Sequence, residues 1–198
     1  MNSINENPYW HQEVKPHVFD PVRVEELCLI AFEAFATSQA LSRNFVDAED
    51  GGSNLTHPRL IGKHRAKAEA KISSALLTLS ITYRALEEQL GHSEKFINFQ
   101  KDNTDFFGQQ LNWYEGKRET QTSLRDACNK IIHAEDLRPT YERNEYSGDG
   151  NVWFMDGVFE MEGTSTRGDR WHVSIILPDF LETMLAVAGF VETSDNEA

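Results

Sequence analysis

Three polar side chains recur at four-residue spacing in the segment SLRDACNKIIHAEDLRP, residues 123 to 139: Arg125, Asn129 and His133. Histidine titrates near neutral pH and can accept or donate a proton. Arginine can clamp a phosphate through two N–H groups, and asparagine can orient a substrate or a water molecule. A ribonuclease that works without a metal ion needs a proton acceptor for the ribose 2′-hydroxyl and a cation beside the phosphorane-like transition state. We therefore take the three residues as a candidate catalytic set.

The spacing predicts that these side chains share one side of a short helix over residues 120–134, with Thr120 or Thr122 as its N-cap. On a helical wheel of about 100° per residue, His133 points away from the apolar face. Asn129 lies about 40° from His133 on this wheel, and Arg125 lies about 80° from His133. We call Arg125, Asn129 and His133 the polar ridge, and we expect it to face water or a second chain. The alternative is an ordinary solvated face whose histidine favours the C-terminal helix dipole. The apolar face consists of Leu124, Ala127, Cys128 and Ile131.

Asn129, three intervening residues and His133, in a short helix after a two-helix hairpin, resemble the arginine–polar–xxx–histidine motif of HEPN domains. The resemblance covers about residues 20–134. It implies a helical domain that binds nucleotides or RNA, of the kind found in toxin–antitoxin, abortive-infection and CRISPR defence systems. Many such domains are ribonucleases that form homodimers in which two motifs line one cleft. This chain departs from the motif, because Cys128 occupies the arginine position and Arg125 lies one turn earlier.

Hydrophobic periodicity predicts the helices that position the ridge. An Asp20-Pro21 start and apolar steps of three and four predict a helix from residue 21 to about 45. A loop over 46–58 and a second helix over about 60–90 follow, ended by Gly91, and these two helices should form an antiparallel hairpin. Residues 93–114 are predicted to be helical but less regular, with a break near Asp102.

After Pro139 the apolar period changes from about 3.6 to 2 residues, which predicts strands. We expect strands at 151–163 and 170–177, a weaker strand at 139–146, and a closing helix from about Asp179 to Gly189. The predicted fold is thus mainly α with a small antiparallel β element, a hairpin or a three-stranded sheet. The expected organisation is an irregular arm (1–19), a helical bundle (20–134), the sheet with the closing helix packed on the bundle (135–191) and a disordered tail (192–198).

Charge is distributed unevenly along the chain. The net charge is −13, and residues 135–198 alone carry 14 acidic and 4 basic residues, a net charge of −10. This region should repel polyanions and could bind a basic protein partner. Residues 57–71 are basic instead, and Lys63, His64 and Lys67 are the candidate substrate-binding residues there. The alternative for this stretch is a solvated helix face.

Other features exclude several classes of protein. No apolar run approaches the roughly 20 residues that a membrane-spanning helix needs, and the N-terminus lacks the pattern of a signal peptide, so we expect a cytoplasmic protein. Cys28 and Cys128 fall on apolar helix faces, which favours reduced core thiols. The sequence contains no metal or cofactor motif, so we expect neither. Two functional hypotheses remain: an RNA-binding or RNA-cleaving homodimer, and a non-catalytic module for protein interaction.

Overall fold

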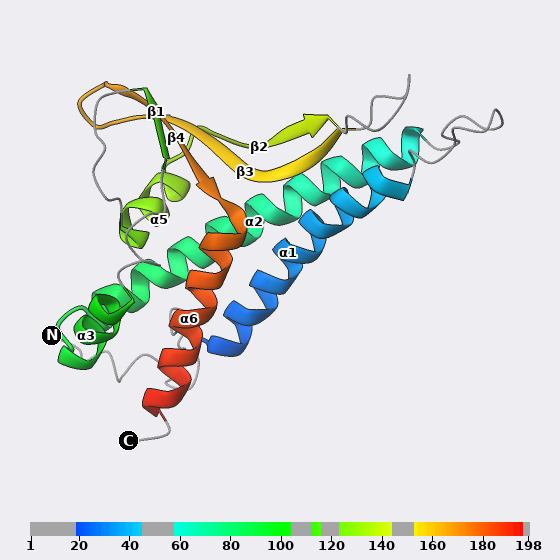
Figure 1. The fold of residues 1–198 in the computed structure, drawn as a ribbon. Helices are drawn as coiled ribbons and strands as arrows, with labels where there is room; N and C mark the ends of the chain where they lie inside the picture. Colours follow the sequence, from blue (N-terminus) through cyan, green and yellow to red (C-terminus); the bar gives the residue numbers. More distant parts are fainter. Residues whose placement is uncertain (1–18, 45–57, 104–111, 116–122, 144–152, 196–198) are drawn as a thin grey trace, which may run out of the picture.

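The computed structural model describes residues 19–44, 58–103, 112–115, 123–143 and 153–195 (Figure 1). The predicted fold class is confirmed: helices predominate, a small antiparallel sheet follows the bundle, and a helix ends the fold. The elements in chain order are α1 (Pro21–Asn44), α2 (Pro58–Leu90), α3 (Glu94–Asp102), β1 (Asn112–Glu115), α5 (Leu124–Ile132), β2 (Asp136–Arg143), β3 (Trp153–Thr164), β4 (Arg170–Ile176) and α6 (Leu177–Asp195). The predicted arm and the predicted loop at 46–58 lie almost entirely outside the described residues, but Phe19 is buried in the core.

The two long helices form the predicted antiparallel hairpin, as Figure 1 shows. The apolar stripes expected from the periodicity are buried on both helices. On α1 the stripe includes Val24, Cys28, Ala31 and Phe35, and on α2 it includes Ile72, Leu76, Leu79, Tyr83 and Leu86. Side chains at steps of three and four share one helix face, so each helix can bury a continuous stripe against the other.

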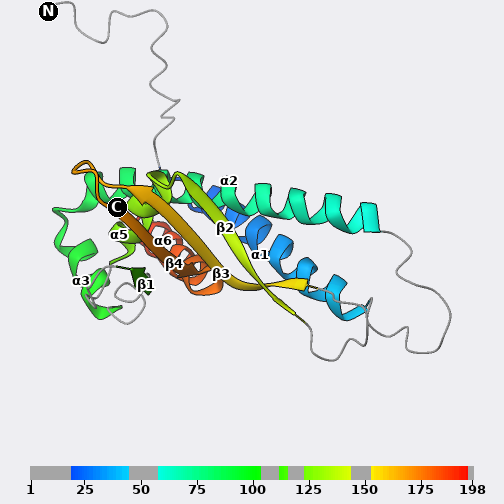
Figure 2. The same ribbon diagram turned by 90° about the horizontal axis from the view of Figure 1, so that it is seen from above.

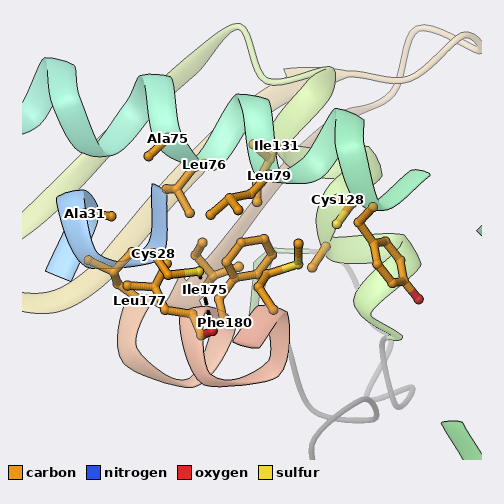
Figure 3. Packing of buried hydrophobic residues seen from close by; sticks show 14 of the residues in the cluster. Cys28, Ala31, Ala75, Leu76, Leu79, Cys128, Ile131, Ile175, Leu177 and Phe180 are labelled. Atoms are coloured by element: carbon orange, nitrogen blue, oxygen red, sulfur yellow. Dashed lines mark hydrogen bonds between the residues drawn. The ribbon is translucent and has the colours of Figure 1, made fainter. Parts of the chain in front are cut away.

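The sheet has four antiparallel strands in the order β1-β4-β3-β2, and it lies across one side of α1, α2 and α6 (Figures 1 and 2). Alternate residues of β3 and β4, such as Phe159 and Ile175, point toward the helices and are buried. These residues join Leu79 of α2 and Phe180 of α6 in one hydrophobic core (Figure 3). The bundle and the sheet therefore share a single core. Among the described residues, no helix covers the other side of the sheet.

The predicted helix over residues 93–114 is wrong at its C-terminal end, and residues 104–111 lie outside the described residues. Helix α3 ends at Asp102, and Asn112–Glu115 form strand β1, in which Trp113 pairs with Val173 of β4. Aromatic residues such as those in this segment are common in strands, and the edge of β4 offers backbone groups to pair with. That edge is built by residues about 60 positions later, so no local pattern indicated it.

The C-terminal helix is longer than predicted at both ends. Helix α6 begins at Leu177, directly after β4, and continues through Gly189 to Asp195. The residues after Gly189 make core contacts, because Val191 is buried and the Phe190 ring stacks on Phe99 of α3 with centroids 4.5 Å apart. Residues 192–195 of the predicted tail are therefore helical, and residues 196–198 lie outside the described residues.

Gly189→Ala is expected to raise the free energy of unfolding by about 1 kcal/mol, because alanine has a higher helix propensity than glycine. A Cβ at this exposed position would meet no atom within 4 Å. Urea unfolding followed by circular dichroism measures the change. The matched control is Gly157→Ala, which should destabilise the protein, since Gly157 has a φ of +97° and its added Cβ would lie 3.2 Å from the Phe35 ring. A loss of stability in Gly189→Ala would mean that the helix ends at Gly189.

Candidate functional site

Helix α5 carries the polar ridge, and its first turn is fixed by a capping box. The Ser123 Oγ accepts a hydrogen bond from the Asp126 N–H at 3.2 Å, and the Asp126 Oδ2 accepts one from the Ser123 N–H at 3.1 Å. Ser123 is therefore the N-cap, and the predicted caps at Thr120 and Thr122 are wrong. This reciprocal pair satisfies two backbone donors at the start of a helix, which explains why the helix begins here.

The apolar face of α5 is buried as predicted, and the structure shows that it packs against α2. Its four apolar residues, Leu124, Ala127, Cys128 and Ile131, are all buried. Cys128 is fully enclosed, and burial raises the pKa of its thiol to about 12. Burial likewise raises the pKa of Cys28 on α1 to about 12, with a smaller effect from Glu182. The prediction of two core thiols is confirmed, and both side chains lie in the core seen in Figure 3.

The ridge lies on the opposite side of α5. Arg125 and His133 are exposed and Asn129 is half-buried. His133 is the C-cap residue, with φ −104° and ψ 10°, and its N–H donates to the Asn129 carbonyl at 3.1 Å. Arg125 and His133 therefore lie outside the core, as the helical wheel predicted.

The polar ridge was expected to face water or a second chain, but Arg125 also forms an ion pair with Glu87 of α2. Its Nη1 lies 2.6 Å from Oε2 of Glu87, and the same oxygen lies 2.6 Å from Nη1 of Arg84. The Glu87 side chain is only 13% exposed, whereas that of Arg125 is 47% exposed. The carboxylate thus fixes one edge of the guanidinium and offsets part of its charge, while other N–H groups of Arg125 remain at the surface.

The structure adds a cation that sequence reasoning missed. The Lys130 Nζ lies 3.9 Å from the centroid of the Trp171 ring of β4. Burial lowers the pKa of Lys130, and the nearby Asp126 carboxylate opposes this effect. Lys130 is three residues before His133, so the sequence already placed it next to the ridge. The contact with Trp171 depends on the folded sheet and had no local signal.

The end of α5 fits closely against the sheet at Gly163 of β3. A Cβ at Gly163 would lie 2.3 Å from Cζ2 of Trp171 and 3.0 Å from the carbonyl oxygen of His133. The absence of a side chain therefore lets the indole pass over the strand and reach Lys130. In addition, the Glu135 N–H donates to the Glu162 carbonyl at 2.8 Å. These contacts hold the C-terminal end of the ridge on the sheet.

The candidate substrate-binding residues lie at a different place. Lys63 and Lys67 are exposed and His64 is half-buried, all in the first turns of α2. Glu87, which holds Arg125, is 20 positions after Lys67 on the same helix, which corresponds to about 30 Å. The structure therefore does not bring Lys63, His64 and Lys67 together with the ridge.

Arg65, also in the basic stretch, has a structural role. Its Nη2 donates to the Trp153 carbonyl at 3.3 Å, and its guanidinium lies 4.8 Å from the centroid of the Tyr141 ring. Tyr141 in turn donates a hydrogen bond to Glu69 of α2. Arg65 thus fastens α2 to the sheet. Trp153 is 46% exposed at the start of β3, whereas Trp171 of β4 is buried.

Acidic side chains gather on the uncovered side of the sheet. Arg138 of β2 lies between three carboxylates, at 3.3 Å from Asp136, 3.6 Å from Glu160 and 3.0 Å from Glu162. Arg170 of β4 lies 3.5 Å from Glu162. The C-terminal negative charge predicted from the sequence is therefore partly offset by arginines on this face, and carboxylates outnumber them among these residues.

Across the described ranges, no group of three or more His, Cys, Asp and Glu side chains is arranged to hold a metal ion. None of the described helices has both the length and the apolar character that crossing a membrane requires. The chain matches no family model, no curated protein and no solved structure.

Proposed function

We propose that this protein is a HEPN-like RNA-binding protein that cleaves RNA at the polar ridge of α5. The observation that carries the proposal is the two-sided character of this helix. One side is fully buried against α2, while Arg125 and His133 remain exposed on the other. The ridge is also held in place at both ends, by Glu87 and by the contacts with the sheet. Fixed positions are what a catalytic group requires, because misplacement by about 1 Å can cost about 100-fold in rate.

The proposed reaction is an internal transesterification of RNA. The neutral imidazole of His133 takes the proton from the ribose 2′-hydroxyl, and the 2′-oxygen forms a bond to phosphorus. The bond from phosphorus to the 5′-oxygen breaks, which leaves a 2′,3′-cyclic phosphate and a 5′-hydroxyl end. Arg125 donates to a non-bridging phosphate oxygen through an N–H that Glu87 does not use, and Asn129 orients the ribose. Histidine and arginine suffice for these roles, so the proposed reaction is metal-independent.

Substrate binding extends beyond the ridge in this proposal. Lys63, His64 and Lys67 attract the RNA backbone at the other end of α2, about 30 Å away. A homodimer that brings two ridges to one cleft would complete the site, as the resemblance to HEPN domains implies. The same resemblance suggests a role in antiviral defence or in a toxin–antitoxin pair.

The test is cleavage of a mixed RNA pool in EDTA by the wild-type protein and by the His133→Ala variant. The oligomeric mass of both proteins is recorded in the same experiment. The wild type should leave cyclic phosphate ends, and His133→Ala should be slower by about 100- to 10,000-fold, since the variant loses its general base. His92→Ala, at an exposed histidine after α2, is the matched control and should cleave like the wild type. Undiminished cleavage by His133→Ala would show that His133 is not the base.

A second candidate function is protein interaction through the uncovered side of the sheet. The observation that favours it is the group of carboxylates around Arg138. A basic partner would replace or join Arg138 and Arg170 at these carboxylates, and its binding would weaken with salt. Absence of RNA cleavage by the wild type would favour this function over the first.

A further inference from the structure

We propose that Lys130 is the general acid of the cleavage reaction and gives its proton to the 5′-oxygen that leaves. This inference rests on the proposed ribonuclease function, because it adds a catalytic residue next to the polar ridge. The 5′-oxygen would otherwise leave as an alkoxide, which is strongly basic. A positioned acid at this step contributes about 100- to 10,000-fold to the rate.

The other described polar residues on this side of α5 are poor candidates for the acid. A guanidinium group does not act as a proton donor in proteins, and Glu87 holds one edge of the guanidinium of Arg125. The Asn129 amide does not titrate. The Asp126 carboxyl group accepts hydrogen bonds from the N–H and the hydroxyl of Ser123, so it serves as part of the capping box.

The position of Lys130 fits the role of acid. It is three residues before His133, and residues three apart are neighbours on a helix surface. The Trp171 ring, 3.9 Å from Nζ, limits where the ammonium group can lie. Gly163 allows this arrangement, because any side chain at that position would collide with the indole. The acid and the base would therefore both be held by the end of α5 where it meets the sheet.

The surroundings of Lys130 act in both directions on the acidity of its ammonium group, and burial has the largest effect. Partial burial lowers the pKa of the ammonium group, which makes it a stronger acid, and Asp126 one turn earlier limits this effect. From the sheet, Lys130 meets the uncharged Trp171 ring, whose face stabilises the charged form. On α2, the Glu87 carboxylate binds both Arg84 and Arg125, and Arg125 lies at the other end of α5.

Each proton taken up in the proposed reaction is matched by one that is released. His133 gains the proton of the 2′-hydroxyl as the bond from the 2′-oxygen to phosphorus forms. Lys130 loses its proton to the 5′-oxygen as the bond between that oxygen and phosphorus breaks. After the products leave, water returns a proton to Lys130 and takes one from His133. The transesterification therefore consumes no proton and needs no further reactant.

The experiment compares two dinucleotide substrates in EDTA, one with the normal 5′-oxygen and one with sulfur in its place. A thiolate leaves readily without protonation, so the sulfur substrate does not need the acid. Lys130→Ala and Lys130→Arg should cleave the oxygen substrate about 100- to 10,000-fold more slowly than the wild type. Both should cleave the sulfur substrate within a few-fold of the wild-type rate. His133→Ala should be slow on both substrates, because it lacks the base.

Lys130→Arg is the decisive variant, because it keeps the positive charge and the contact with the Trp171 ring but is too weak an acid to give up its proton. Wild-type cleavage of the oxygen substrate by this variant would overturn the inference and leave Lys130 as a fixed charge. Equal slowing of Lys130→Ala and Lys130→Arg on both substrates would also overturn it and indicate a structural role. Failure of the wild type to cleave either substrate would instead refute the proposed function itself.

Discussion

Cys128→Arg is expected to unfold the protein, although it would bring the segment closer to the arginine–polar–xxx–histidine pattern that it resembles. Cys128 is fully buried between α5 and α2, where burial already raises the pKa of its thiol to about 12. An arginine there would place a larger, charged side chain in the core without a partner. Overpacking costs about 1–3 kcal/mol and an uncompensated buried charge about 3–5 kcal/mol. The sum is similar to the whole stability of many proteins of this size.

Thermal unfolding followed by circular dichroism, with size-exclusion chromatography, measures the effect of Cys128→Arg. Cys128→Ala is the first control and should cost only about 1 kcal/mol, since it removes a single sulfur atom. Ile132→Arg is the second control, because Ile132 is a half-buried position on the same helix where the arginine can reach water. If Cys128→Arg unfolds at the wild-type temperature, α5 must face its neighbours differently, and the ridge would no longer be the exposed side.

The spacing of apolar residues along the chain was sufficient to predict much of this fold. The buried stripes of α1 and α2 and the buried face of α5 follow from the repeat of apolar residues at steps of three and four. Strands β3 and β4 follow from the alternation of apolar residues at every second position. These features could be predicted because the direction of a side chain on a helix or strand depends mainly on its own position in the element.

The features that could not be predicted depend on residues distant in the chain. Strand β1 forms because the edge of β4 is available, and α6 passes Gly189 because Phe190 stacks on Phe99. The same holds for the candidate site. The wheel placed Arg125 and His133 outside the core, but the partner of Arg125 on α2 and the Trp171 ring beneath Lys130 exist only in the folded chain.

Both proposals depend on α5 being held at its two ends by different parts of the fold. Glu87 of α2 fixes the beginning of the ridge through Arg125. At the other end, Trp171 contacts Lys130, and the backbone of Glu135 bonds to that of Glu162. A change at the sheet should therefore disturb His133 and Lys130 while leaving Arg125 in place. The contributions of the two ends of α5 can thus be measured separately.

Gly163→Val is the change that should break the sheet end, at a cost of about 3 kcal/mol or more. The added Cβ alone would lie 2.3 Å from the Trp171 ring and 3.0 Å from the His133 carbonyl, and the valine methyl groups would add further overlap. The ring is buried and cannot move outward without leaving the core. Urea unfolding measures the cost, and the matched control is Thr164→Val at the exposed next position of β3, which should change stability by less than about 0.5 kcal/mol.

A double-mutant cycle shows whether the cost arises from Trp171 itself. Gly163→Ala should destabilise the wild type but cost markedly less in a Trp171→Leu background, since leucine leaves room for the new methyl group. The two changes should therefore show a coupling of about 1–3 kcal/mol. Additive costs would mean that the indole does not pass over Gly163. Lys130 would then lack its contact with Trp171, and the geometric argument for Lys130 as the acid would fail with it.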